Sequence, residues 1–374
     1  MMRLKGSVVK IISCAVALAF CFVVMRFFSV QVLELMGKLT LYSVQSYLPV
    51  IPETETQVSV QSDEVQTEPA TAVAATEKVT VKAQNDLTKI DADISKIIKN
   101  AGKSSAADKK DGDIYEYTFT DDGATDIFQT VKVKNTNKTR IDIKEKLGEE
   151  LELSVSKNEP AVLIYHTHTT ETYQILDRNF YAQGFLSRSN DENLNMIRVG
   201  KAVAGELEKQ GYKVIHDTTV YDKSYNGAYS RSRVGAEHYL EKYPSIKITL
   251  DIHRDAIQND NGVKTKPVAT INGKKAAQIM LLTGCQEEGN DVTDLPEWEK
   301  NLTFALKLQQ SLETNFPGLT RPVFFCDRSY NMGLTPLSLL VEVGSDANTL
   351  DEAVYSGKML GRALSLILEE YEEN

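Results

Sequence analysis

The sequence predicts an α/β fold in which residues 160–374 form a mainly parallel sheet flanked by helices. Two observations carry this prediction. Short apolar runs alternate with longer segments of helical periodicity through this part of the chain, as expected for a parallel sheet with helices on both sides. The apolar runs are continuous, as in residues 161–165, which is typical of strands buried on both faces.

Each element of this pattern can be placed along the chain. The first long helix carries apolar residues at helical spacing, and Gly211 follows it where a C-cap glycine is expected. We predict strands at residues 161–165, 213–217, 246–252, 277–283, 322–326 and 337–343, and helices at residues 193–210, 231–242, 298–315 and 349–371.

The start of the chain has the character of a membrane anchor. Residues 11–25 are uncharged and apolar and follow basic residues. This run is shorter than the ~20 residues of a spanning helix, but flanking Lys and Arg side chains can snorkel to the interface. We predict a cytoplasmic start and an uncleaved transmembrane anchor in residues 1–32, with the rest of the chain extracytoplasmic. A cleaved secretory signal is the alternative.

Between the anchor and the sheet the sequence predicts a tether and a lead-in segment. Residues 51–84 contain no aromatic residue and are rich in Thr, Glu, Val and Ala, so they bury too little apolar surface to offset the entropy of ordering. We assign residues 33–110 to a flexible tether that includes a short helical segment at 86–100. Residues 111–159 are assigned to a small β/helical lead-in.

Composition argues against several classes of function. The formal charge of −10 has the wrong sign for a general nucleic-acid-binding protein, which needs clustered Lys and Arg. No Gly-rich phosphate loop follows a predicted strand. The four cysteines form no Cys-x-x-Cys pair, the spacing of zinc-finger and thioredoxin-type motifs. Cys285 and Cys326 either pair as an extracytoplasmic disulfide or remain two buried thiols.

Three of the five histidines lie just past predicted strands. His168-Thr-Thr-Glu171 follows the strand at 161–165, and His253 follows the strand at 246–252. Open α/β sheets bind ligands beyond the carboxyl ends of their strands, and zinc hydrolases usually take three protein ligands and leave the fourth position to water. We therefore predict a zinc site made by His168, Glu171 and His253, although a turn histidine bonded to backbone is the default interpretation of His168 alone.

Three further residues are candidates for the chemistry. Glu342 lies within the apolar strand at 337–343, where burial should raise its pKa and allow it to act as a general base and then as a general acid. Arg254 adjoins His253 and is the arginine best placed to bind a substrate carboxylate. His166 is an alternative metal ligand, and the preferred interpretation is that it orients a ligand or a transition-state oxygen.

Three segments around these residues carry a resemblance. They are Ile-Tyr-His-Thr-His-Thr-Thr-Glu at 164–171, Asp-Ile-His-Arg-Asp-Ala at 251–256 and Leu-Val-Glu-Val-Gly-Ser-Asp-Ala-Asn-Thr-Leu-Asp-Glu-Ala at 340–353. Together with Val199-Gly-Lys, Tyr225-Asn-Gly-Ala-Tyr229 and Arg321-Pro…Tyr330-Asn331, they resemble the stage II sporulation protein P family of endospore-forming bacteria. The resemblance covers roughly residues 160–374.

This resemblance implies a membrane-anchored cell-wall hydrolase that acts during engulfment of the forespore. It implies a phosphorylase/hydrolase-like α/β domain similar to that of zinc N-acetylmuramoyl-L-alanine amidases, with cleavage of that amide bond and of peptide cross-links in peptidoglycan. The implied partners, besides the wall and the membrane, are the sporulation stage II proteins D and M. On this resemblance His168 and His253 match the two histidine ligands of the amidases, and Glu342 matches their catalytic glutamate.

The chain departs from the amidase pattern at one ligand. The amidases' glutamate ligand usually lies further on, where this chain has Asp191 and Glu192, whereas Glu171 has the His-x-x-Glu placement of zinc carboxypeptidases. We expect Glu171 to be the ligand, with Asp191 or Glu192 as the alternative. The rival functions are an anchored, non-catalytic wall-binding or scaffold protein and a zinc carboxypeptidase.

Overall fold

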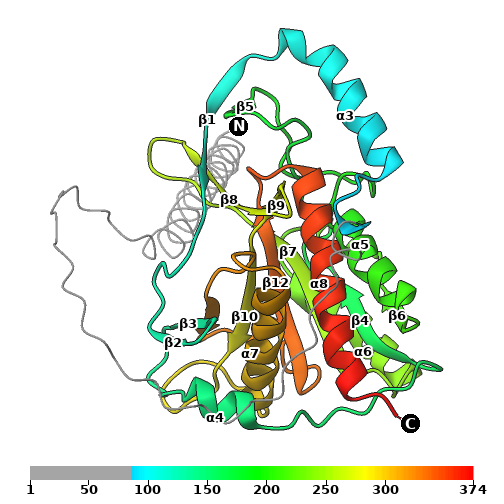
Figure 1. Cartoon of the computed structure of the whole chain (residues 1–374), viewed down its shortest axis with the longest axis vertical. Helices are drawn as coiled ribbons and strands as arrows, with labels where there is room; N and C mark the ends of the chain where they lie inside the picture. The colour runs from blue at the N-terminus through cyan, green and yellow to red at the C-terminus, as the bar shows by residue number, and fades with distance from the viewer. Residues whose placement is uncertain (1–85, 374) are drawn as a thin grey trace, which may run out of the picture. The chain divides into compact units, whose positions relative to one another are not determined.

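Strands and helices alternate along residues 86–373, the part of the chain that the computed structural model describes (Figure 1), so the α/β fold is confirmed. The helices are α3 (Ala92–Ser104), α4 (Ile143–Gly148), α5 (Met196–Lys209), α6 (Ala228–Lys242), α7 (Trp298–Asn315) and α8 (Leu350–Glu370), with a 3-10 turn η1 at Ser105–Ala107. The strands are β1 (Lys110–Tyr117), β2 (Asp126–Phe128), β3 (Val131–Asn135), β4 (Pro160–Tyr165), β5 (Phe180–Ala182), β6 (Lys213–His216), β7 (Ile248–Asp255), β8 (Lys264–Ile271), β9 (Lys274–Ala277), β10 (Ile279–Gly284), β11 (Val323–Cys326) and β12 (Leu337–Ser345).

The main sheet has eight strands in the order β2-β3-β11-β10-β12-β7-β4-β6. Every neighbouring pair is parallel except β2–β3 and β10–β12, in agreement with a mainly parallel sheet. β12, β7 and β4 are adjacent and parallel. Their carboxyl ends therefore lie at the same edge of the sheet.

Helices cover both faces of this sheet. Val162 and Ile164 of β4 belong to the main core, which also holds apolar residues of α5, α7 and α8, whereas Leu163 and Tyr165 pack in a separate cluster with residues of α6. Figure 1 shows α8 (red) and α7 in front of the strands. Because successive side chains of a strand point to opposite faces, cover on both sides explains why the apolar run in β4 is continuous.

Local sequence sets where the helices begin and how closely they pack. The Asn195 side chain caps α5 by accepting the backbone N–H two residues on at 3.0 Å. Thr349 and Glu352 form a capping box at the start of α8. A Cβ atom on Gly361 of α8 would lie 2.6 Å from the carbonyl oxygen of Val203 in α5. The close approach of these two helices therefore requires glycine at residue 361.

The lead-in segment is integrated with the rest of the described chain. β2 and β3 extend the main sheet, with β3 paired in parallel with β11. β1 joins a separate four-stranded sheet in the order β5-β1-β8-β9. Strand pairing therefore shows no division between residues 111–159 and residues 160–374.

Some elements differ from the sequence-based expectations. β8 and β9 form an antiparallel hairpin that was not predicted, although its turn, Asn272-Gly273, has the positive φ values (+50° and +76°) that an Asn-Gly hairpin turn adopts. The strand predicted at 277–283 is the end of β9 followed by β10, and the helix predicted at 86–100 is α3, which begins at Ala92.

The predicted membrane anchor in residues 1–32, and the predicted tether up to residue 85, lie outside the described residues. Within residues 86–373, no helix is both long enough and apolar enough to cross a membrane.

Cys285 and Cys326 are buried, and neither forms a disulfide in the described part of the chain. They lie at the ends of the parallel neighbours β10 and β11, where Cys326 is opposite Gly284. Because Cys285 follows Gly284 and side chains alternate along a strand, the two thiols point to opposite faces of the sheet. Of the two alternatives, the structure shows two buried thiols.

Candidate functional site

The carboxyl ends of β4, β7 and β12 bring the predicted site residues together. His253 of β7 is directly opposite Glu342 of β12. After β4 the chain turns sharply, and the backbone N–H of Glu171 donates to the carbonyl of His168 at 3.2 Å. The backbone N–H of Arg254 in β7 donates to Oε2 of Glu171 at 3.3 Å, which fixes the turn beside β7.

His168, Glu171 and His253 form a buried group, with exposures of 8%, 5% and 3%. The ring centroids of His168 and His253 are 5.3 Å apart and the rings lie at 84°, while Oε2 of Glu171 lies 3.8 Å from Nδ1 of His253. Among residues 86–373, Nδ1 of His168 and Nε2 of His253 are buried without a hydrogen-bond partner. Since buried polar atoms are normally paired, Nδ1 of His168 calls for a partner from outside the chain, whereas Nε2 of His253 has the Asp251 carboxylate 2.8 Å away.

This donor set fits zinc in its chemistry. Two imidazoles and a carboxylate are a ligand set that zinc takes in hydrolases. In the part of the chain described here, no three His, Cys, Asp or Glu side chains are gathered closely enough to hold a metal ion.

The alternative carboxylates are placed differently. Asp191 and Glu192 are exposed, and Oδ1 of Asp191 accepts the N–H of Asn193 at 2.9 Å within its own turn. Glu171 is the carboxylate that the structure brings beside His253.

Glu342 faces the same region from β12. The residue is half-buried, and within the described residues its Oε2 atom has no hydrogen-bond partner. Burial, reinforced by the Asp255 carboxylate, raises the pKa of Glu342 well above its usual range, and the nearby His253 only partly opposes this. A carboxyl group with its pKa raised toward neutrality can both take up and release a proton.

Asp251, to which the sequence analysis gave no role, contacts His253 from the same face of β7. It accepts the backbone N–H of Thr167 at 2.8 Å and the Thr167 hydroxyl at 2.6 Å. Its Oδ1 lies 2.8 Å from Nε2 of His253, although this contact is not aligned as a hydrogen bond. Burial lowers the pKa of His253, but Asp251, with the Glu171 and Glu342 carboxylates, raises it overall to about 9. The Asp-x-His spacing in the sequence could have indicated this pair, because residues two apart in a strand point to the same face of the sheet.

Arg254, which was predicted to bind a substrate carboxylate, forms hydrogen bonds with backbone carbonyls of the protein. Its side chain is buried, and its guanidinium donates to the carbonyls of Thr172 at 3.1 Å and Ser187 at 2.8 Å. These bonds tie the segment after Glu171 to β7. These contacts favour a structural role for Arg254, and its binding to a substrate carboxylate stays a prediction.

A second guanidinium lies closer to solvent on the same side. The Arg188 side chain is 37% exposed, and its Nη2 lies 3.4 Å from Oε1 of Glu171. Its Nη1 pairs with the buried Asp222, which also accepts the Thr170 hydroxyl at 2.6 Å. Arg188 therefore adds positive charge beside Glu171.

His166 lies in a buried histidine pair. Its Nδ1 is 2.9 Å from the Ile252 carbonyl, and its Nε2 is 2.9 Å from Nε2 of His216. A carbonyl only accepts, so Nδ1 of His166 carries the proton and its Nε2 accepts from His216. Burial lowers the pKa of both residues, that of His216 to about 4, which keeps both rings neutral. Through Ile252, His166 supports the strand next to His253.

Tyrosines surround the two imidazoles of the site. Tyr225 stacks on His168 at 4.8 Å and 8°, and Tyr229 lies edge-on to His168 at 5.6 Å and nearly parallel to His253 at 6.3 Å and 11°. Tyr330 in turn stacks on Tyr229 at 5.3 Å. The Tyr225-Asn-Gly-Ala-Tyr229 segment was noted in the sequence only as part of the resemblance.

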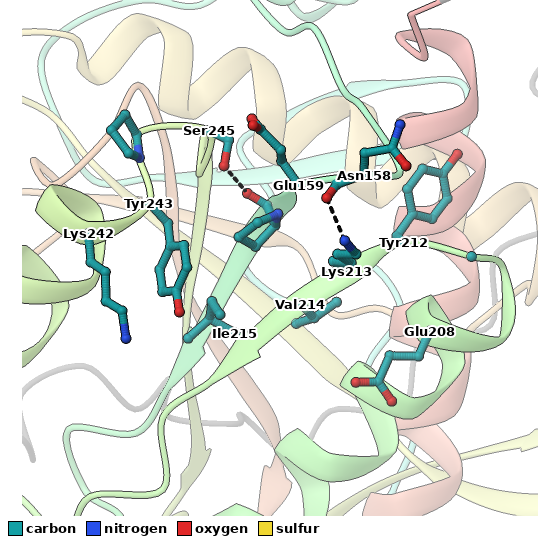
Figure 2. Close-up of a pocket in the computed structure, with 13 residues that line it drawn as sticks. Asn158, Glu159, Glu208, Tyr212, Lys213, Val214, Ile215, Lys242, Tyr243 and Ser245 are labelled. Atoms are coloured by element: carbon teal, nitrogen blue, oxygen red, sulfur yellow. Dashed lines mark hydrogen bonds between the residues drawn. The ribbon is translucent and has the colours of Figure 1, made fainter.

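A groove of about 950 Å³ lies at the opposite edge of the main sheet (Figure 2). It is lined by Pro160 and Lys213, which begin β4 and β6, and by residues just before β7 such as Ser245. The Ser245 hydroxyl donates to the Pro160 carbonyl at 2.8 Å, and this bond is drawn as the dashed line that starts at Ser245 in Figure 2. The groove contains none of the predicted site residues.

Several solved structures are similar to the chain. The amidase AmiC2 of Nostoc punctiforme has a TM-score of 0.32 at 14% identity, over 56% of this chain and 96% of that chain. The CwlD amidase of Clostridioides difficile, in complex with the GerS lipoprotein, has a TM-score of 0.34 at 13% identity, over 56% of this chain and 98% of that chain. TM-scores below 0.5 at this identity assign no reaction to the chain.

Sequence comparison identifies the family. The stage II sporulation protein P of Bacillus subtilis (strain 168) is 29% identical over 203 residues, which are 51% of this chain and 47% of that protein. The chain thus spans about half the length of this curated relative. The family model of stage II sporulation protein P matches residues 43–365. Because this match extends over most of the sequence, the chain belongs to the stage II sporulation protein P family.

Proposed function

We propose that the chain is a zinc-dependent peptidoglycan hydrolase that cleaves the N-acetylmuramoyl-L-alanine amide bond. The observation that carries this proposal is the convergence of two imidazoles and two carboxylates on three adjacent strand ends. Within residues 86–373, Nδ1 of His168 and Oε2 of Glu342 are buried without partners. Membership of a sporulation family and the resemblance to the zinc amidases support peptidoglycan as the substrate.

In this proposal His168, Glu171 and His253 hold the ion, and Asp251 orients His253. When bound, zinc would acidify a water molecule and polarise the amide carbonyl. Glu342 would accept a proton from that water as its oxygen bonds to the carbonyl carbon. It would then deliver the proton to the nitrogen as the C–N bond breaks, leaving a carboxylate and an amine. The raised pKa of Glu342 supports this double role.

The setting of the reaction is part of the same proposal. Cleavage would occur on the extracytoplasmic side of the membrane during engulfment, with the stage II proteins D and M as partners and peptide cross-links as a second class of bond. The apolar residues 11–25 support a membrane location. Membrane fractionation of the chain with and without residues 1–32, and co-purification with proteins D and M, test these points.

Digestion of purified peptidoglycan by the full-length chain tests the reaction. Products are analysed by mass spectrometry with and without chelator and added zinc. Free stem peptides that disappear with chelator and return with zinc are expected. Release of single C-terminal residues would indicate a carboxypeptidase instead, and wall binding without cleavage by folded, zinc-loaded protein would indicate a scaffold.

Two matched variants test the carboxylate ligand. Glu171→Gln should weaken zinc binding and abolish cleavage, because the amide lacks the negative charge that stabilises the ion. Glu192→Gln, at the exposed alternative position, should behave like the unaltered chain. The reverse result would move the carboxylate ligand from Glu171 to Glu192.

A further inference from the structure

Tyr330 and Asn331 adopt left-handed backbone conformations in succession, with φ of +39° and +59°. Asn tolerates this region, but a bulky residue such as Tyr rarely enters it. Strain of this kind persists only where surrounding contacts impose it. The Asn331 side chain provides such contacts, because its Nδ2 donates to the carbonyl of Tyr229 at 2.9 Å and to the hydroxyl of Ser232 at 3.1 Å.

A continuous chain of polar contacts runs from Asn331 to His253. The hydroxyls of Ser232 and Thr167 are 2.6 Å apart, and the Thr167 hydroxyl donates to Oδ2 of Asp251 at 2.6 Å. The other oxygen of Asp251 lies 2.8 Å from Nε2 of His253. The exposures along this path are 7% for Asn331, 0% for Ser232 and Thr167, 1% for Asp251 and 3% for His253.

The donors in this chain all point the same way. Nδ2 of Asn331 can only donate, so the Ser232 oxygen accepts this hydrogen bond. The Thr167 proton is used on Asp251, so the Ser232 proton makes the short contact with Thr167 at 2.6 Å rather than the longer one with the Tyr229 carbonyl at 3.1 Å. Each hydroxyl therefore accepts from the side of Asn331 and donates toward Asp251, an arrangement in which successive bonds strengthen one another. The path ends on the carboxylate that contacts His253.

An aromatic path connects the same turn to the same imidazole. The Tyr330 ring stacks on Tyr229 with centroids 5.3 Å apart and planes at 29°. Tyr229 lies nearly parallel to His253, at 6.3 Å and 11°. Asn331 thus reaches His253 through hydrogen bonds that end on Asp251, and Tyr330 reaches it through ring contacts.

We propose that the Tyr330–Asn331 turn is a positioning element that sets the orientation of the His253 imidazole and, through it, the affinity of the site for zinc. The part concerning zinc rests on the proposed function. Asn331 acts through Ser232, Thr167 and Asp251 and contacts neither metal nor substrate.

The test replaces Asn331 by glycine in the full-length chain. Glycine enters the left-handed region without steric cost, so Asn331→Gly retains the turn and removes the amide. Asn272→Gly is the matched control: Asn272 also has a positive φ (+50°), in the β8–β9 hairpin. Zinc affinity is measured by competition with a chromophoric chelator, and folding by circular dichroism. Asn331→Gly should weaken zinc affinity about 10–100-fold, the usual effect of losing an outer-shell partner, and Asn272→Gly should leave it unchanged.

A double-mutant cycle tests the path itself. Thr167→Val removes the hydroxyl that links Ser232 to Asp251 and should weaken zinc affinity by a similar factor. If the path carries the effect, the double variant should lose little more than either single variant. Additive losses, or an unchanged zinc affinity in folded Asn331→Gly, would overturn the proposal.

A readout without zinc separates this inference from the proposed function. In the metal-free chain with histidines isotopically labelled, Asn331→Gly should shift the ring signals of His253, while those of His238, in α6, stay in place. If the unaltered chain neither binds zinc nor cleaves peptidoglycan, the proposed function fails. The positioning role is then tested by the His253 ring signals alone. Unchanged His253 signals would overturn it.

Discussion

Replacing Gly200 by alanine should destabilise the protein, whereas the same replacement at Gly205 should stabilise it. Both glycines lie in α5. A Cβ atom at Gly200 would lie 2.5 Å from Nε2 of His166 and 2.5 Å from Nε2 of His216, whereas at Gly205 it would meet no atom within 4 Å. The first position tests the buried histidine pair, and the second isolates the helix propensity of alanine.

The two effects have opposite signs. Alanine favours a helix over glycine by about 1 kcal/mol, which is the gain expected for Gly205→Ala. At Gly200 this gain is outweighed by overpacking of about 1–3 kcal/mol and by disturbance of the buried His166–His216 hydrogen bond, which costs about 1–3 kcal/mol. The expected net loss is about 3 kcal/mol, so the two variants should differ by about 4 kcal/mol.

Urea unfolding of the two full-length variants, followed by circular dichroism, measures this difference. The unfolding slopes should be the same, so the change appears in the midpoint. If Gly200→Ala proved as stable as Gly205→Ala, α5 would not be packed against the two imidazoles, and the account of His166 would be wrong.

Two further predictions concern the buried His216 and Arg254 side chains. Burial lowers the pKa of His216 to about 4, below the ~6.5 of an unfolded chain. Its contribution to stability is therefore present above pH 6.5 and lost as the pH falls toward 4, by up to ~1.4 kcal/mol per pH unit. His216→Asn should flatten the loss of unfolding free energy between pH 7 and pH 5, and parallel curves would contradict this. Arg254→Lys should lower the unfolding free energy by about 2 kcal/mol, because an ammonium group cannot hold the Thr172 and Ser187 carbonyls together. A raised KM with unchanged stability would instead support Arg254 as a substrate-binding residue.

The central part of the fold and site could be predicted from the sequence because the signals are local. β4 is a continuous apolar run, β7 and β12 are mostly apolar where they begin, and the chemistry-bearing residues follow or interrupt these runs. His168, Glu171, His253 and Glu342 could be placed at one edge of the sheet because parallel strands end together.

Side-chain partners distant in sequence could not be predicted. The carbonyls that hold Arg254 belong to Thr172 and Ser187, and the partner of His166 is His216. A local sequence pattern indicates which residue is buried, but it does not indicate which group far along the chain forms hydrogen bonds with that residue. For the same reason the lead-in was assigned apart from the sheet, since β3 pairs with β11, far along the chain.

The central claim is that Glu342 moves the proton in a zinc-dependent cleavage of peptidoglycan. The most direct measurement is the rate of stem-peptide release by full-length Glu342→Gln, compared with the unaltered chain at equal zinc occupancy. The variant should fold and bind zinc normally, yet lose cleavage by a factor of about 10²–10⁴, the usual contribution of general acid–base catalysis. Cleavage at the rate of the unaltered chain would contradict the account.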